Sequence, residues 1–371
     1  MLSTTGTLSS NELFLEDIAP YALCQKEKEQ HLLHYLTILC SWHYQRSNEY
    51  RRFCQGLKTS FPPRSIEQIP FLPTPLFKQK ELVSAAGKTK TILSSSTSSG
   101  IPSKIFVSKE NALLQQESIQ LIFNDFIGRQ RRPYIIFDDI QTARGKSSIT
   151  ARGAALMALM PYASQFFFVM DIQKGKLVLN REKLEAALAV VQQNDGECIA
   201  YGFSYILHKA CNAIKEEQID LSAVNGNSFL IHSGGWKNHD KGKQSLPELN
   251  RDLEKQWGLI KGHCFDFYGM AEQTGLACPT CLYGNKHIPY YTEIIVRDPH
   301  TLTPVTDGEK GLVQLLSLLA QTSPNHSILT DDIASITAVD SCPCGRGGKA
   351  FTLHTRAQAA KVRGCSAIYQ E

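Results

Sequence analysis

Residues 91–126 read TILSSSTSSGIPSKIFVSKENALLQQESIQLIFNDF and place a serine-rich loop between a predicted strand and a predicted helix. The β-branched run at residues 91–95 predicts the strand, and residues 109–125 have the pattern of an amphipathic helix. Loop hydroxyls and backbone amides can bind polyphosphate oxygens, Gly100 permits a tight turn, and Lys104 adds a positive charge. The spacing differs from GxxxxGK(S/T), which excludes a P-loop NTPase, whereas a polar surface loop without a ligand stays open as an alternative.

The chain beyond about residue 90 alternates short β-branched or aromatic runs with longer amphipathic stretches, which is typical of an α/β protein. Further strands are predicted at residues 134–137, 165–170, 198–201, 229–233 and 264–268, and further helices at residues 181–194, 203–216 and 247–256. Three more strands are predicted at residues 290–298, 311–319 and 334–339. We therefore expect an α/β core at residues 81–286, followed by a β-rich subdomain and tail at residues 287–371.

The first 80 residues have a different pattern. Residues 26–58 carry apolar side chains at helical period, with no proline or glycine before Gly56, and predict a helical segment. Residues 61–77 contain five prolines, which oppose regular helix. We expect this second stretch to be an extended strap whose apolar side chains pack on the body of the protein.

The composition is that of a soluble globular protein, with 42% hydrophobic and 20% charged residues among 371. A net charge of +4 without a run of like charges argues against a nucleic-acid-binding protein. The N-terminus lacks a signal-peptide pattern and no stretch of 18 apolar residues occurs, so we expect a cytoplasmic protein without a membrane span. Eleven cysteines without a secretion signal favour thiol or metal chemistry over disulfides.

A second motif, CFDFYGMAEQTG at residues 264–275, joins the end of a predicted strand to a turn with Tyr268, Gly269 and Glu272. An aromatic ring at a strand end can stack on a base, and a carboxylate four residues later can hold phosphate-bound Mg²⁺. Taken alone, the segment can equally be an ordinary strand end with a solvated glutamate.

The order of the motifs resembles that of adenylate-forming enzymes, in which a serine-rich loop precedes YGxxE and then a TDD segment, here at residues 330–332. More narrowly, the chain resembles the acyl-protein synthetases of the LuxE type, relatives of phenylacetate-CoA ligases. The matching segments are IPFLPTPLFKQKEL (69–82), SSSTSSGIPSK (94–104), SGGWK (233–237), YGMAEQTG (268–275), GEKGLVQLLSLL (308–319), HSILTDDIASI (326–336), CPCGRGGKAF (342–351) and KVRGCS (361–366). The resemblance implies one adenylate-forming domain over residues 1–371, with mixed sheets layered with helices and a small β-rich subdomain.

The resemblance also implies roles for individual residues in binding ATP and Mg²⁺. Glu272 would hold Mg²⁺, Tyr268 would pack on the base beside Gly269, and Asp332 would bind both ribose hydroxyls. Arg356 falls where an arginine contacts the nucleotide. The phosphate contacts would come from Ser95, Ser96, Ser98, Ser99, Gly100 and Lys104, and the adenine pocket from Ser233, Gly234 and Gly235.

Two departures from the family pattern affect these roles. Thr97 replaces the usual glycine of the phosphate loop, and residues 354–360 are a loose version of the hinge segment. The chain also stops at Glu371, where typical adenylate-forming enzymes continue into a mobile domain with a catalytic lysine. We therefore expect that domain to be absent or reduced to a tail.

The resemblance also implies a role for Cys365, which lies near the C-terminus in the segment KVRGCS. Members of the family transfer the acyl group from acyl-AMP to a cysteine at this place, and Lys361 and Arg363 would favour the nucleophilic thiolate. The expected reaction is activation of a carboxylic acid, with a fatty acid as the family-based choice, followed by thioester formation and hand-over to an acyl-CoA reductase-type or carrier-protein partner. Ligation to CoA or to a carrier-protein thiol is the first alternative, and a non-catalytic scaffold for an acyl reductase or transferase is the second.

Four residues have the spacing of a structural zinc site. Five residues separate Cys281 from His287, and Cys342 and Cys344 flank a proline further on. Cys278 competes as the fourth ligand through its CxxC spacing with Cys281. The alternative is that these thiols and the imidazole are free of metal.

Overall fold

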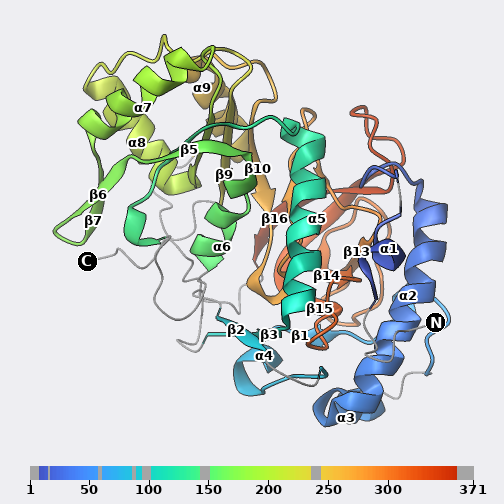
Figure 1. Cartoon of the computed structure of the whole chain (residues 1–371). Coiled ribbons are helices and arrows are strands. Elements are labelled where there is room, and N and C mark those ends of the chain that lie inside the picture. The colour runs from blue at the N-terminus through green and yellow to red at the C-terminus, as the bar shows by residue number, and fades with distance from the viewer. Residues whose placement is uncertain are drawn as a thin grey trace.

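A mostly parallel sheet forms one half of the computed structural model (Figure 1). Its strands follow the order β11-β10-β9-β8-β4-β5, and only β11 runs antiparallel to its neighbour. Their bounds are β4 Arg132–Ile136, β5 Ala163–Phe168, β8 Ile199–Phe203, β9 Phe229–Ser233, β10 Cys264–Tyr268 and β11 Cys278–Pro279. The structure describes residues 8–15, 17–56, 61–85, 89–93, 102–142, 151–234 and 244–356. The central strands β4, β8, β9 and β10 are almost wholly buried, because helices and the second sheet cover both faces.

Helices cover both faces of this parallel sheet. One face packs against α7 (Arg181–Gln193), α8 (Ser204–Glu216) and α9 (Leu246–Trp257), and the other against α5 (Lys109–Ile127) and α6 (Ala151–Met157). In Figure 1, α5 stands between the two halves of the molecule. Its start is set by Ser108, whose side chain accepts a hydrogen bond from the Asn111 N–H group.

A second, mainly antiparallel sheet forms the other half, with the order β12-β16-β15-β14-β13 and β1 parallel to β15. Its strands are β1 Leu72–Pro73, β12 Lys286–His287, β13 Thr292–Arg297, β14 Gly311–Ser317, β15 Ser327–Val339 and β16 Lys349–Arg356. Two hairpins complete the strands, β2 (Lys90–Leu93) with β3 (Lys104–Val107) and β6 (Met170–Gln173) with β7 (Lys176–Leu179). The short 3₁₀ helices are η1 Ile66–Gln68, η2 Ile140–Thr142, η3 Met160–Tyr162 and η4 Ala271–Gln273. The α/β class with mixed sheets and helices is confirmed.

The N-terminal helices α1 (Ser10–Leu13) and α2 (Gln25–Arg46) pack against the outer face of the second sheet (Figure 1). Helices α3 (Asn48–Gly56) and α4 (Leu76–Gln79) belong to a separate core cluster with β1, β3 and Ile328 of β15. The helical segment expected at residues 26–58 is split at Ser47, whose extended backbone (φ −107°, ψ 114°) ends α2 before α3 begins. The proline-rich stretch is mostly extended, with η1, β1 and α4 as short regular pieces. Its Ile69, Leu72 and Phe77 are buried as expected, whereas Phe61 is 36% exposed.

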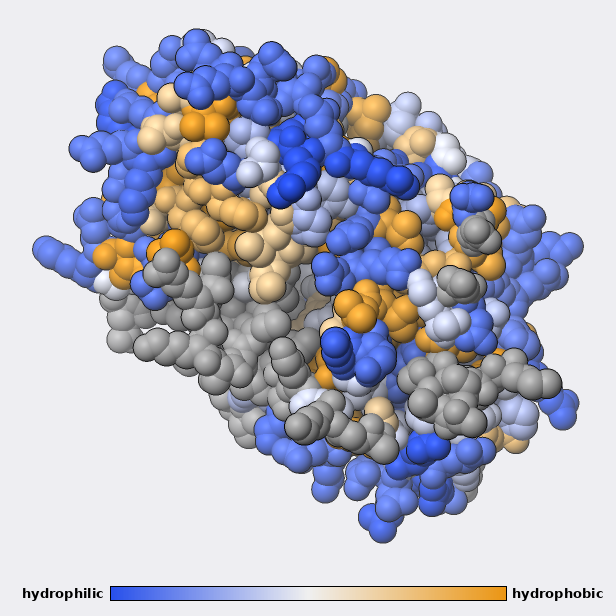
Figure 2. Space-filling view, viewed as in Figure 1, coloured by the Kyte–Doolittle hydropathy of each residue, from blue (hydrophilic) through white to orange (hydrophobic). Residues whose placement is uncertain are grey.

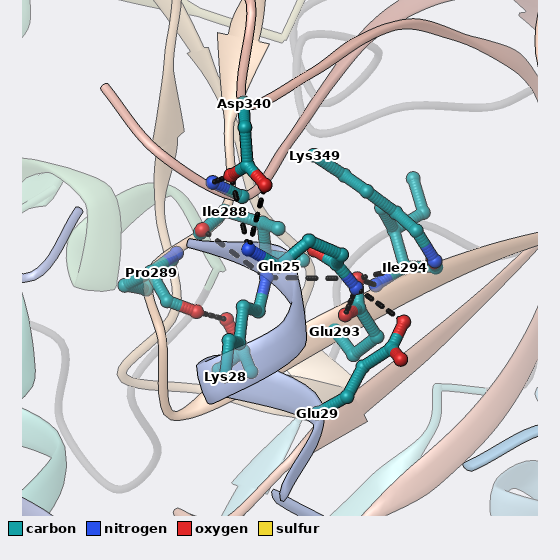
Figure 3. A network of polar contacts seen from close by, with 11 residues as sticks. Gln25, Lys28, Glu29, Ile288, Pro289, Glu293, Ile294, Asp340 and Lys349 are labelled. Carbon is teal, nitrogen blue, oxygen red and sulfur yellow. Dashed lines mark hydrogen bonds and ion pairs between the residues drawn. The ribbon is translucent and has the colours of Figure 1, made fainter. Parts of the chain in front are cut away.

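A buried polar network holds the first turn of α2 against the second sheet (Figure 3). The Asp340 carboxylate accepts hydrogen bonds from the Gln25 N–H group at 3.0 and 2.9 Å, so a residue distant in sequence caps the helix. The Glu293 carboxylate lies 3.5 Å from Lys28 Nζ and 3.7 Å from Lys349 Nζ, and it accepts a 2.7 Å hydrogen bond from Gln25. Burial favours a raised pKa for Glu293, but Lys28 and Lys349 outweigh it and hold the pKa below its ordinary value.

The connection between β14 and β15, residues 318–326, is irregular and wholly buried, and we call it the central loop. A buried loop is stable only if its backbone polar groups find protein partners. Trp42 Nε1 donates to the Gln321 carbonyl at 3.3 Å, and His43 Nε2 donates to the Ala320 carbonyl at 2.9 Å. Asn111 of α5 donates to the Leu319 carbonyl at 2.5 Å. The central loop thus joins α2 and α5 to the second sheet.

The surface seen in Figure 2 has an apolar area over β5, α6 and the β6–β7 hairpin. Phe166 on the edge strand is 41% exposed, Met157 46%, Ile172 42% and Val178 39%. Among the helices in the described part of the chain, none combines the length and the hydropathy needed to cross a bilayer.

We expect Glu293→Gln to lower the free energy of unfolding by about 3–5 kcal/mol, because it leaves the buried Lys28 and the partly buried Lys349 without their counter-charge. Chemical denaturation at neutral pH measures the change. The matched control is Glu185→Gln, which breaks an ion pair with Arg181 in which both side chains are 49% exposed and should cost no more than about 0.5 kcal/mol. Equal costs for the two variants would contradict the importance of the buried network.

Acid should destabilise the fold through the stacked rings of His43 and His326, whose centroids are 4.8 Å apart. Burial lowers the pKa of His43 to about 4, and burial followed by His43 lowers the pKa of His326 well below its ordinary value. Between pH 6.5 and 4 the unfolded chain therefore binds more protons than the folded chain, and stability falls as the pH falls.

The test is the slope of unfolding free energy between pH 6 and 5. His43→Gln removes one such group and should make the slope shallower by about 1 kcal/mol per pH unit. His300→Gln, on an exposed turn, is the control and should keep the wild-type slope. A wild-type slope in His43→Gln would contradict the assignment.

Candidate active site

The carboxyl edge of the parallel sheet brings together the ends of β9 and β10, which carry Ser233 and Tyr268. The two strands are in register, with Phe267 opposite Ser233. Ligands of open α/β sheets bind outside this edge, because the loops that follow the strands diverge there. Two segments singled out from the sequence thus lie side by side.

The second sheet contributes Asp332 to the same place. The Tyr268 hydroxyl donates a 2.8 Å hydrogen bond to Asp332 Oδ2 across the junction between the sheets. The Tyr268 ring is partly buried and contacts Phe351 edge to face, with centroids 6.3 Å apart. Arg356 is the register partner of Asp332 on β16, while its side chain lies outside the described residues.

The turn after β9 is closely packed against the end of β8. A hydrogen bond of 2.8 Å joins the hydroxyls of Ser233 and Tyr201, and Ser204 Oγ donates to the Ser233 carbonyl at 3.0 Å. Gly234 has φ +84°, and a Cβ atom there would lie 2.4 Å from the Phe203 ring. Only glycine fits this position without displacing Phe203. Gly235, the third residue expected here, lies outside the described residues.

Glu272 lies in the one-turn helix η4 that follows Gly269, and only 8% of its surface is exposed. Its Oε1 atom accepts a 2.6 Å hydrogen bond from the Ser103 hydroxyl, at the end of the serine-rich segment. Its backbone carbonyl accepts a 2.5 Å hydrogen bond from Asn325 of the central loop. The carboxylate is therefore held beside the hairpin that bears the predicted phosphate loop.

The side chain of Lys104 makes a surface ion pair instead of a buried contact. Its Nζ atom lies 2.9 Å from Glu81 Oε1, and the two side chains are 44% and 66% exposed. Surface pairs of this kind contribute little stability, so the lysine can exchange Glu81 for another anion at low cost. Ser95, Ser96, Ser98, Ser99 and Gly100, like Thr97 and Cys365, lie outside the described residues.

A second cluster joins the segment around β12 to the turn between β15 and β16. The ligand atoms of Cys281, His287, Cys342 and Cys344 all lie within 4.8 Å of one another, and the first three residues are buried. Cys281 and Cys342 have sulfur atoms 3.9 Å apart, and Cys344 Sγ is 3.2 Å from His287 Nε2. Cys278 is fully buried and does not belong to this cluster, so the geometry favours His287 as the fourth ligand.

The geometry of this cluster fits a tetrahedral zinc ion. Zn–S bonds of about 2.3 Å place two sulfur atoms about 3.8 Å apart in a tetrahedron, close to the observed separation. Burial lowers the pKa of His287 to about 4, which keeps the imidazole in the neutral form that binds metal. Four protein ligands leave no open position, so an ion here would stabilise the structure and would not catalyse.

Comparisons with known proteins show the family of the chain. Residues 5–371 match the family described as "Acyl-protein synthetase, LuxE". The chain belongs to the LuxE acyl-protein synthetase family. It is therefore an enzyme of the AMP-forming ligase class, which activates a carboxylic acid.

Two relatives of this LuxE-type chain are named "Long-chain-fatty-acid–luciferin-component ligase". That of Aliivibrio fischeri is 25% identical over 337 residues, which cover 88% of this chain and 84% of the relative. That of Vibrio harveyi is 22% identical over 338 residues, with 88% and 83% covered. Among solved structures, an open conformation of 2-hydroxyisobutyryl-CoA ligase with 2-HIB-AMP and CoA gives a TM-score of 0.67 at 16% identity, over 94% of this chain and 80% of that one. At this identity the structural likeness shows the adenylate-forming fold alone.

The sequence analysis of the LuxE-type chain gave no role to three residues that contact the site. Ser103 bonds to Glu272, Tyr201 bonds to Ser233, and Asn325 bonds to the Glu272 backbone. Ser103 lies within the quoted serine-rich segment, so its position next to Lys104 was a signal that could have been used. Tyr201 and Asn325 lie outside any motif with a readable spacing, and only the fold brings them to the site.

We expect the purified LuxE-type protein to hold about one zinc ion per chain, measured by elemental analysis after purification without chelator. Cys342→Ser should lower the zinc content strongly and reduce the midpoint of thermal unfolding, because metal binding stabilises only the folded state. Cys278→Ser is the control with a buried cysteine outside the cluster and should retain zinc. Metal-free wild-type protein with unchanged stability would overturn the site.

Proposed function

We propose that this LuxE-type enzyme activates a long-chain fatty acid with ATP and then acylates its own Cys365. In the first step a carboxylate oxygen attacks the α-phosphorus of ATP, and pyrophosphate leaves. In the second step the Cys365 thiolate attacks the acyl carbonyl carbon, the thioester bond forms, and AMP leaves with the former carboxylate oxygen. Dividing one difficult transfer into two easier ones is the general advantage of covalent catalysis.

The observation that carries this proposal is the convergence of Ser233, Tyr268 and Asp332 at one edge of the parallel sheet. In our proposal the nucleotide lies over the ends of β9 and β10, with its base beside Tyr268 and Gly234. The ribose hydroxyls bond to Asp332, whose second carboxylate oxygen Tyr268 orients. Arg356 follows on the adjacent strand and contacts the nucleotide.

In our proposal the phosphates face the hairpin β2–β3 and Glu272. The Glu272 carboxylate would hold Mg²⁺, which when bound would supply positive charge beside the phosphates. Lys104 exchanges its exposed partner Glu81 for a phosphate oxygen. Ser95, Ser96, Ser98, Ser99 and Gly100 complete the phosphate contacts in this proposal.

The choice of a fatty acid is supported by the printed name of the two bacterial relatives, which are ligases of a long-chain fatty acid and a luciferin component. Phe168 ends β5 and Phe203 ends β8, the two strands on either side of β4, and in our proposal these aromatic rings border the acyl chain. The acyl group on Cys365 would then pass to a partner, for which we propose an acyl-CoA reductase-type or carrier protein.

The test combines pyrophosphate release with intact-mass spectrometry, using ATP, Mg²⁺ and a series of fatty acids. Asp332→Asn should weaken ATP use by about 10- to 100-fold, the effect of losing a charged hydrogen bond. Cys365→Ser should still release pyrophosphate while it loses the acyl mass gain. Cys24→Ser, which removes a partly exposed cysteine, is the control and should still be acylated.

Each outcome separates the proposed steps. A mass gain that persists in Cys365→Ser overturns the acceptor, and pyrophosphate that depends on added CoA assigns the acyl group to an external thiol. Wild-type protein that neither binds ATP nor releases pyrophosphate overturns catalysis and favours a scaffold.

A further inference from the structure

The hydrogen bond between Ser103 and Glu272 connects two motifs that lie 169 residues apart in sequence. Ser103 is completely buried, and its hydroxyl donates to Glu272 Oε1 at 2.6 Å. Glu272 is itself 8% exposed, so solvent can hardly replace the hydroxyl as a partner of this carboxylate oxygen. This hydrogen bond is therefore shielded from solvent by the fold.

We propose that Ser103 is a positioning residue that orients the Glu272 carboxylate for Mg²⁺. This inference rests on the proposed function, in which Glu272 binds the ion. Because Ser103 occupies Oε1, it fixes the rotation of the carboxylate and leaves Oε2 as the oxygen for the metal. Carboxylates that ligate metals are commonly held by such hydrogen bonds, and loss of the partner typically costs about 10- to 100-fold in metal affinity.

The two partners of this hydrogen bond are held by the same element, the central loop. On one side, Ser323 Oγ accepts from the Phe106 N–H group at 3.2 Å and donates to the Phe106 carbonyl at 3.0 Å. These bonds hold β3, the strand that begins at the residue after Ser103. On the other side, Asn325 holds the Glu272 carbonyl. The hydroxyl and the carboxylate thus share one rigid support, as accurate orientation requires.

The backbone around Glu272 does not depend on Ser103. Gln273 Nε2 donates to the carbonyls of Leu315 and Asn325, each at 3.0 Å, and Asn325 donates to Glu272. Removal of the Ser103 hydroxyl therefore frees the carboxylate to rotate while η4 stays in place. This separates an effect on the metal from a general effect on the fold.

The experiment measures ATP binding to the full chain by calorimetry, in Mg²⁺ and again in EDTA, without the acid. The ratio of the two dissociation constants reports what Mg²⁺ adds to binding. Ser103→Ala should reduce this ratio by about tenfold or more and leave the EDTA value unchanged. Ser103→Thr retains a hydroxyl and should restore the ratio to within about threefold of wild type, whereas Glu272→Gln should remove the Mg²⁺ effect.

Two further variants serve as a control and as a replacement for Ser103→Ala. Ser228→Ala removes another buried hydroxyl, bonded to Gly196 and Cys198 at the opposite end of β9, and should keep the wild-type ratio whatever stability it loses. If Ser103→Ala does not fold, Ser103→Cys takes its place, since a thiol is a weaker donor of similar size and should also reduce the ratio.

The outcomes distinguish this inference from the proposed function. A wild-type ratio in Ser103→Ala or Ser103→Cys, together with a loss of the Mg²⁺ effect in Glu272→Gln, overturns the positioning role alone. A wild-type ratio in Glu272→Gln overturns the metal role of Glu272 and with it this inference. If Ser103→Ala reduces the ratio and Ser103→Thr does not restore it, the positioning role is also overturned, because the hydroxyl would then not be the group responsible.

Discussion

The central loop, residues 318–326, is the constraint on which the rest of the structure depends. Irregular backbone inside a protein is tolerated only when other segments satisfy its donors and acceptors. Those segments are α2 through Trp42 and His43, α5 through Asn111, and β3 through the contacts of Ser323. The elements that build the candidate site are thus ordered around one buried connection.

The two sheets contribute different parts of the site. The parallel sheet supplies an edge where Ser233 and Tyr268 emerge next to each other, and the second sheet supplies Asp332 from its longest strand. Neither sheet alone carries all three of these residues. The hydrogen bond from Tyr268 to Asp332 therefore depends on the core packed between the sheets, in which Phe267 and Phe351 both take part.

Sequence patterns predicted the strands of the parallel sheet well where both faces are buried. The strands at residues 229–233 and 264–268 have the expected bounds, because short runs rich in aromatic and β-branched residues are followed directly by glycine. The break between α2 and α3 at Ser47 was not predicted, since no proline or glycine marks it and tertiary contacts decide it. Strand β16 and helix α6 were also missed, because neither has a clear periodicity.

For the site, motif order placed Ser233, Tyr268, Glu272 and Asp332 in one region, but the contact partners could not be predicted. The pairing of Ser103 with Glu272 depends on tertiary contacts that both segments make with the central loop. Local sequence patterns do not predict such contacts. The choice between Cys278 and His287 as metal ligand likewise needed coordinates, because both have acceptable spacing.

The capping of α2 by Asp340 bears on how the chain folds during synthesis. The two residues of this contact are 315 positions apart, and Lys28 likewise depends on Glu293. When α2 leaves the ribosome, the residues that cap it and neutralise its lysine have not yet been translated. Its apolar face belongs to a core cluster that also contains Tyr290 and Leu316, which are made late in synthesis. The native docking of α2 can therefore be completed only after residue 340 has been translated.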